Sequence, residues 1–156
     1  MTYRIIDEPA PGGLSRYAVS PDMPLLGVIL FGSVVTWPWL AFNSFAIGSA
    51  SKDKECWLCA VGAFGGFALA FGLVTLAEHL PVWVHPYLAL VYLAWKLGFT
   101  YPIYFLQSRS FELYEFHGGC VVRNRVAFLF ALFVYVAIRV AIPYSELPDW
   151  VALGLK

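Results

Sequence analysis

The residues whose type and spacing point most directly to chemistry are three cysteines. Cys56 and Cys59 form a Cys-x-x-Cys motif at the start of a long apolar run, and Cys120 lies in a more polar stretch further along the chain. Such a motif at a helix N-terminus stabilises a thiolate, which is the nucleophile of thiol–disulfide exchange. One hypothesis is therefore a thiol–disulfide oxidoreductase that uses Cys56, Cys59 and Cys120.

The cysteine arrangement resembles that of the bacterial inner-membrane, quinone-linked disulfide-forming enzymes. Those enzymes have four helices, a Cys-x-x-Cys after the first helix and a second cysteine pair before the fourth. This chain departs from them because Cys120 stands alone where they have a pair, and because no arginine follows Cys59 in the same run to hold a quinone. A zinc site of Cys56, Cys59, His117 and Cys120 is a further alternative. Inert thiols are the default interpretation, and we expect no cofactor.

A few polar side chains interrupt the apolar runs, and these are the other candidate binding residues. Lys96 lies in the middle of one run, where a charge costs at least about 2.5–3.5 kcal/mol in a bilayer and marks a candidate site for an anion or a proton. The alternative is that Lys96 extends its stem to the membrane interface. We expect Arg139 to form an ion pair with Glu78, and Asn43 to hydrogen-bond between helices.

One apolar run carries small residues at a spacing that allows close helix packing. Gly62, Gly66 and Ala70 recur every four residues and share one face of a helix. We expect this face to meet a neighbouring helix of the same chain, with a second copy of the chain as the alternative.

The composition indicates the elements that hold these residues. Of 156 residues, 60% are hydrophobic and only 13% are charged, the net charge is zero, and the mean hydropathy is +0.71. Soluble domains carry about 25% charged residues, so water is not the expected solvent. The absence of a basic excess argues against nucleic-acid binding. We therefore expect an integral membrane protein of the bacterial inner membrane, with the lipid bilayer as its first partner.

Four apolar runs reach the roughly 20 residues that a helix needs to cross a bilayer. They cover residues 24–50, 57–77, 83–107 and 126–144, after a polar N-terminal tail at 1–23. Short connections favour antiparallel neighbours, so we predict a single all-α domain, an up-down-up-down bundle of four transmembrane helices.

The longest connection, 108–125, has a pattern of its own. Polar and apolar residues alternate at 111–116, Gly118 and Gly119 follow, and a second short run begins at Cys120. This pattern predicts a small β-hairpin, with an extension of the preceding helix as the alternative. The connections at 51–56 and 108–125 carry more Lys and Arg than the other side, which predicts that they are cytoplasmic and that both termini are outside.

Several further positions carry a second resemblance. The marks are Ser20-Pro21, Gly32, Asn43, Gly48, the charged turn Lys52–Glu55, Leu80-Pro81, Gln107 and Gly118-Gly119. From Ser20 onward the chain thereby resembles a loose group of uncharacterised bacterial four-helix integral membrane proteins. The resemblance implies a topology and supplies no chemistry.

These observations lead to one functional prediction and two alternatives. We predict a non-enzymatic membrane protein that acts through helix packing with a membrane-protein partner or with itself; an immunity protein against a membrane-inserting toxin is one concrete form. The first alternative is a subunit of an oligomeric transporter or channel that uses Lys96. The second is the oxidoreductase that uses Cys56, Cys59 and Cys120.

Overall fold

The chain folds entirely into helices over the residues that the computed structural model describes, which are 12–142 and 147–154. The α-helices are α1 (Asp22–Leu30), α2 (Ser33–Ile47), α3 (Lys52–Ala77), α4 (His85–Phe116), α5 (Asn124–Ala141) and α6 (Asp149–Gly154). Two short 3₁₀ helices, η1 (Ser15–Tyr17) and η2 (Val82–Val84), precede α1 and α4. The all-α prediction is confirmed.

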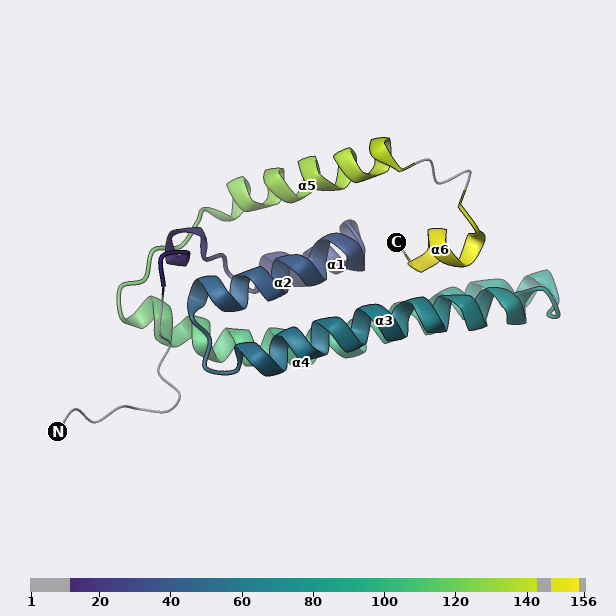
Figure 1. The fold of residues 1–156 in the computed structure, drawn as a ribbon, viewed down its shortest axis with the longest axis horizontal. Coiled ribbons are helices and arrows are strands. Elements are labelled where there is room, and N and C mark those ends of the chain that lie inside the picture. Colours follow the sequence, from purple (N-terminus) through teal and green to yellow (C-terminus); the bar gives the residue numbers. More distant parts are fainter. Residues whose placement is uncertain (1–11, 143–146, 155–156) are drawn as a thin grey trace.

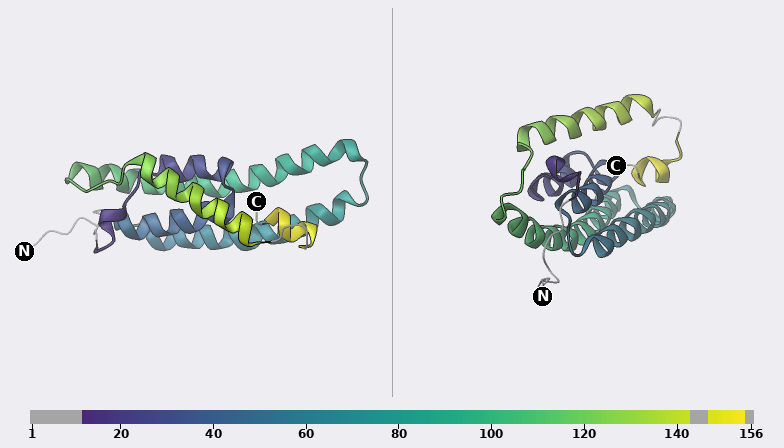
Figure 2. Two further views of the ribbon diagram at one scale, coloured as in Figure 1. Left: turned by 90° about the horizontal axis from the view of Figure 1, so that it is seen from above. Right: turned by 60° about the vertical axis from the view of Figure 1, so that its left-hand side comes forward.

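Helices α3 and α4 run along the long axis of the molecule, and α5 crosses it obliquely (Figures 1 and 2). Helices α3, α4 and α5 are long and apolar enough to cross a membrane, and they contain most of the predicted runs 57–77, 83–107 and 126–144. Positions 143–144 of the last run lie outside the described residues. At a rise of about 1.5 Å per residue, α3 and α4 each exceed the roughly 30 Å of a bilayer core.

The prediction of a single spanning helix over 24–50 is wrong. The chain reverses at Phe31 and Gly32, so that α1 and α2 form a hairpin, here called the α1–α2 hairpin. Contacts pair rising residue numbers on one helix with falling numbers on the other: Val19 meets Asn43, and Gly27 lies close to Thr36. With nine and 15 residues, neither helix reaches across a bilayer core.

Gly32 explains the reversal. Its backbone has φ 78° and ψ 177°, a conformation that is essentially restricted to glycine. The apolar composition is continuous across this point, so hydropathy alone does not separate two antiparallel helices from one long helix.

The β-hairpin predicted in 108–125 is also wrong, and the described residues contain no strand. Residues 108–116 instead extend α4, which ends at Phe116. Ser110, Phe111 and Tyr114 have helical spacing and are all buried, and the last two pack against Ala18 and Ile47. The burial of these side chains stabilises a helix more than the alternating pattern favours a strand. The Gly118 turn follows, at φ 78°.

The helices form layers (Figures 1 and 2). Helices α3 and α4 pack on each other, the α1–α2 hairpin lies on them over one half of their length, and α6 lies on α3 over the other half. Helix α5 lies on the far side of the hairpin, and its main contacts with the described helices are with α1 and α2.

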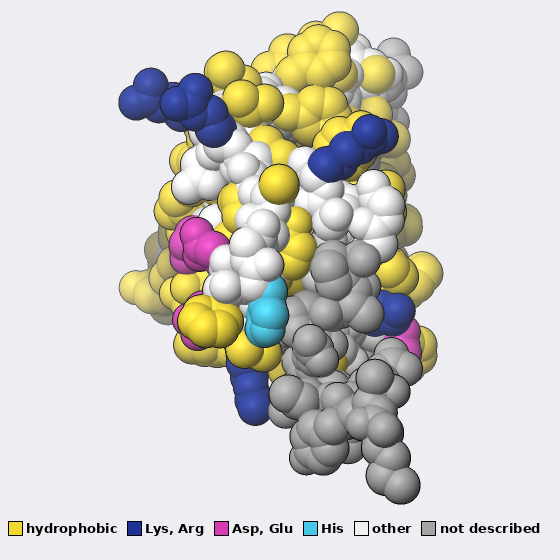
Figure 3. Space-filling model, turned by 90° about the vertical axis from the view of Figure 1, so that its left-hand side faces the viewer, with side chains coloured by type: hydrophobic (Ala, Val, Ile, Leu, Met, Phe, Trp, Pro, Cys, Tyr) yellow, Lys and Arg dark blue, Asp and Glu magenta, His cyan; other side chains and the backbone are white. Residues whose placement is uncertain are grey.

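The reversal at Gly32 also changes which segments share an end of the molecule. The segment from Gly12 to Val19 lies beside the α2–α3 and α4–α5 connections, where the Val122 N–H donates to Ala18 O at 2.8 Å. The cationic residues at this end, partly visible in Figure 3, are Arg16, Lys52, Lys54, Arg109, Arg123 and Arg125. The other two described cationic residues, Lys96 in the middle of α4 and Arg139 near the end of α5, lie away from this end. The predicted placement of the N-terminal side opposite these connections is therefore wrong for the described part.

The reversal leads to a prediction about stability. Replacing Gly32 with alanine should lower the stability of the detergent-solubilised protein by about 1–3 kcal/mol, because a Cβ forces strain at this φ and ψ. Gly72→Ala is the matched control, since Gly72 lies inside α3 with open space around it and should be neutral or slightly stabilising. Thermal unfolding measures both. Equal midpoints for the two variants would contradict the reversal.

Candidate functional site

Asn43 joins three segments at the end of the molecule where the connections gather. It is fully buried; its Oδ1 accepts the Val19 N–H and its Nδ2 donates to Val19 O, both at 2.9 Å. Nδ2 also donates to Gln107 Oε1 at 3.1 Å, and Gln107 Nε2 donates to Leu40 O at 2.6 Å. The pair thereby ties the segment before α1 to α2 and α4.

A second polar cluster lies close to the first in sequence, around Glu55. This carboxylate is fully buried, and its Oε1 accepts hydrogen bonds from Ser49 Oγ at 2.5 Å and from Ser51 Oγ at 2.6 Å. Ser49 Oγ also lies 3.1 Å from Ser110 Oγ of α4. Glu55 Oε2 is buried and has no hydrogen-bond partner within the described ranges. The cluster fixes the α2–α3 turn against α4.

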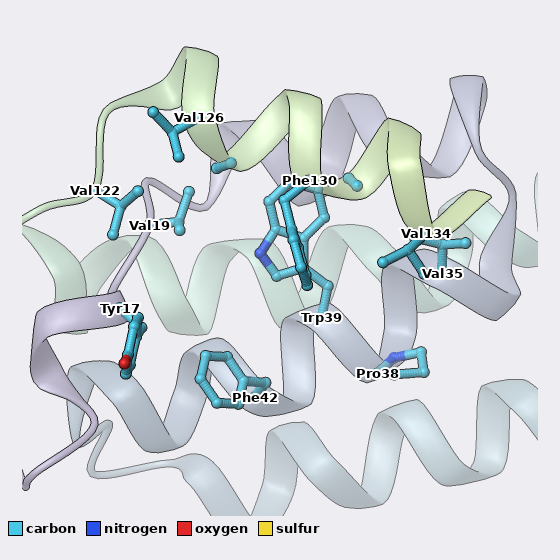
Figure 4. A pocket seen from close by; sticks show the side chains of 12 residues that line it. Tyr17, Val19, Val35, Pro38, Trp39, Phe42, Val122, Val126, Phe130 and Val134 are labelled. Atoms are coloured by element: carbon cyan, nitrogen blue, oxygen red, sulfur yellow. The ribbon is translucent and has the colours of Figure 1, made fainter. Parts of the chain in front are cut away.

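An apolar groove lies between α2 and α5 (Figure 4). Its volume is about 550 Å³, and its walls come from the N-terminal segment, α2, the stretch before α5, and α5 itself. The lining residues are Tyr17, Val19, Val35, Pro38, Trp39, Phe42, Val122, Val126, Ala127, Phe130, Ala131 and Val134. The groove exists because α5 touches the hairpin mainly around Phe31, whose ring packs on Phe128 and Tyr135.

Lys96 lies half-buried in the middle of α4. Its ammonium lies 5.3 Å from the centre of the Tyr92 ring, a cation–π contact on its own helix. One turn further on, Thr100 Oγ1 accepts the Trp37 indole N–H at 3.2 Å. Lys96 therefore lies near the depth at which the α1–α2 hairpin turns back, and the transport alternative continues to rest on this residue.

The predicted ion pair of Arg139 and Glu78 is not formed. Arg139 Nε donates to Tyr135 Oη at 3.1 Å on its own helix, and Glu78 is exposed at the end of α3. The physical reason is the layering, because the hairpin and α6 separate α5 from α3 (Figure 1).

The small-residue face of α3 lies inside the molecule. Gly62, Gly66 and Ala70 are buried, and the Gly62 carbonyl accepts the Trp95 indole N–H at 3.1 Å. A Cβ at Gly62 would lie 3.2 Å from side-chain atoms of Phe99 and Trp37. Small residues on α3 thus admit large aromatic rings from α2 and α4.

The cysteines are free thiols in different surroundings. Cys59 is buried against Trp37, Leu40 and Ile103, Cys56 is partly buried, and Cys120 is exposed. The proposed zinc ligands Cys56, Cys59, His117 and Cys120 do not come together, and the described residues contain no cluster of three or more metal-ligating side chains. The zinc alternative is therefore wrong. Nothing in these surroundings adds to the redox alternative.

Sequence reasoning missed the Gln107 and Glu55 interactions and the apolar groove. Gln107 was noticed only as part of a resemblance, and Glu55 as one charge of a turn. Each of these two residues is a polar side chain at the edge of an apolar run, and this position could have indicated a buried hydrogen bond. Glu55 also lies four residues after Ser51, which is the spacing of two side chains on one face of a helix. The groove had no sequence signal, because it depends on how far α5 stands from α2.

Comparison with known proteins adds no relative, since no family model, curated protein or solved structure matches this chain.

The Asn43–Gln107 pair leads to a prediction about coupling. Asn43→Ala should destabilise the protein by about 1–3 kcal/mol, because it leaves the Val19 amide and carbonyl buried without partners. Gln107→Ala should cost less, and the double variant should cost less than the sum of the two. Unfolding of the three variants in detergent measures this cycle. Strict additivity would show that the two side chains act independently.

Proposed function

We propose that this chain is a polytopic inner-membrane protein with three membrane-spanning helices, α3, α4 and α5, and a re-entrant α1–α2 hairpin. The apolarity and length of the three helices support the spans. Irregular backbone at membrane depth is tolerated where protein buries it, and Phe31, Gly32 and Ser33 are all buried. The hairpin then enters and leaves on the same side.

Charge supports an orientation for this topology. Cytoplasmic segments carry an excess of Lys and Arg. Six of the described cationic residues lie at the end that holds the α2–α3 and α4–α5 connections, and the other two, Lys96 and Arg139, lie away from it. This excess of Lys and Arg is larger than the excess predicted for a protein with four spans, because the reversal brings Arg16 to the same end as the connections. We place this end in the cytoplasm.

We further propose that the protein is non-enzymatic and acts by packing α5 against a helix of a membrane partner. The observation that supports this is the exposure of α5, whose main contacts with the described helices are those with the α1–α2 hairpin. One stripe of α5 carries apolar side chains that are 49–82% exposed: Leu129, Phe133, Val136 and Val140. Helices associate in membranes by such side-chain packing.

Single-thiol labelling tests the topology. In a background with Cys56 and Cys59 replaced by alanine, native Cys120 is compared with Gly13→Cys and Val82→Cys, the latter two carrying Cys120→Ser. A membrane-impermeant maleimide added to intact spheroplasts should label position 82 alone, because positions 13 and 120 lie at the cytoplasmic end. Labelling of both position 13 and position 82 would instead support the topology with four spans. Release of the protein from membranes by alkaline carbonate would exclude membrane integration.

Site-specific photo-crosslinking tests the role of α5. A photoreactive side chain at Phe133 should capture a defined protein in native membranes. The control is Phe105 on α4, which is similarly exposed (65% against 70%) and belongs to a helix already packed within the chain. Lipid adducts alone at both positions would contradict the proposed role.

A further inference from the structure

We propose that the apolar groove between α2 and α5 binds an anionic phospholipid, with one acyl chain between the helices and the phosphate held by Arg16, Arg123 and Arg125. This proposal rests on the membrane topology proposed above and adds a ligand to it. It does not depend on the partner proposed for the outer stripe of α5.

The lining of the groove selects an alkyl chain. Apart from the Tyr17 hydroxyl, every lining side chain is hydrocarbon or the largely apolar indole of Trp39. Ligand pockets usually place several polar groups to orient their ligand, and this groove offers none along its length. Its volume of about 550 Å³ lies within the usual range of ligand sites, about 300–1,000 Å³. A flexible, unfunctionalised chain fits this shape and chemistry.

The charge is concentrated at one end of the groove. Tyr17, Val122 and Val126 line that end together (Figure 4), and each has an arginine next to it in sequence. Arg16 Cζ lies 4.8 Å from the centre of the Tyr17 ring, Arg123 is the N-cap of α5, and Arg125 lies in its first turn. All three arginines are exposed, and no acidic side chain lines the groove.

Two further contacts make this end suitable for a phosphate. The hydrogen bond from Val122 N–H to Ala18 O holds the Arg16 segment beside the Arg123 segment. The N-terminus of α5 adds the positive end of a helix dipole to the two arginines that flank it. Basic pockets between membrane helices on the cytoplasmic side are known to hold anionic headgroups, and the proposed orientation puts these arginines there.

Occupancy also accounts for the position of α5. The helix lies off α2 along the groove, and an acyl chain would supply the packing atoms that α2 and α5 do not supply to each other. A ligand that binds the folded protein stabilises it by mass action, so bound lipid should raise the unfolding midpoint.

Native mass spectrometry of the detergent-solubilised protein tests the headgroup. Phosphatidylglycerol should bind more tightly than phosphatidylcholine with the same acyl chains. The Arg123→Gln/Arg125→Gln variant should lose about 30-fold in phosphatidylglycerol affinity, at about 1 kcal/mol per cation, and should keep its phosphatidylcholine affinity. Lys52→Gln/Lys54→Gln removes two exposed cations from the same end, away from the groove, and should change neither.

A groove-filling pair tests the acyl-chain site. Val126→Trp places an indole in the groove and should weaken both lipids, whereas Leu129→Trp adds the same group to the outward stripe of α5 and should leave binding unchanged. Because both positions are exposed, 57% and 62%, both variants are expected to fold, which size-exclusion chromatography checks. Phosphatidylglycerol should also raise the unfolding midpoint of the unmodified protein more than that of Val126→Trp.

Equal binding of the two lipids, or equal effects of the arginine and lysine variants, would overturn the headgroup site. Equal effects of the two tryptophan variants would overturn the groove. Alkaline carbonate extraction separates the failure of this proposal from the failure of the membrane topology. If the protein stays in the membrane fraction and one of these results is found, only the lipid proposal is wrong. If carbonate releases the protein, both proposals are wrong.

Discussion

The fold depends on one chain reversal and on the hydrogen bonds that close it. Gly32 turns the backbone through a conformation that other residues avoid, and Asn43 then binds both the amide and the carbonyl of Val19 at the open end. Without the reversal, α1 and α2 would form one long helix. The N-terminal segment would then lie at the other end, and the groove beside α5 would lose the wall formed by Tyr17 and Val19.

The sequence was sufficient to predict α3, α5 and most of α4, and insufficient for the α1–α2 hairpin and for how the helices are arranged. Long apolar runs predict these three helices because each run alone satisfies its backbone hydrogen bonds. The same runs do not distinguish a spanning helix from a hairpin, since burial in lipid and burial in protein select the same residue types. Gly32 was visible in the sequence, but the close approach of Gly27 and Thr36 across the turn was not. Likewise, the alternating residues after Ser108 joined α4 because Phe111 and Tyr114 found partners distant in sequence.

The candidate site divides in the same way. The small-residue pattern of Gly62, Gly66 and Ala70 is a local property, and its spacing indicated a packing face. The partners of Asn43 and Arg139 are tertiary properties: Asn43 meets Val19 and Gln107 because the chain folds back, and Arg139 lies far from Glu78 because the hairpin and α6 intervene. The groove is the least predictable feature, since it is defined by a space between helices.

The contacts of the α1–α2 hairpin have a consequence for how the protein is made. The hairpin is synthesised before α4, yet two of its polar contacts are with that helix: Trp37 donates to Thr100, and Leu40 accepts from Gln107, 63 and 67 residues later. The turn of the hairpin is likewise packed by a later helix, since Phe31 lies against Phe128 and Tyr135 of α5. Complete burial of the hairpin therefore has to follow the synthesis of helices that come later in the chain.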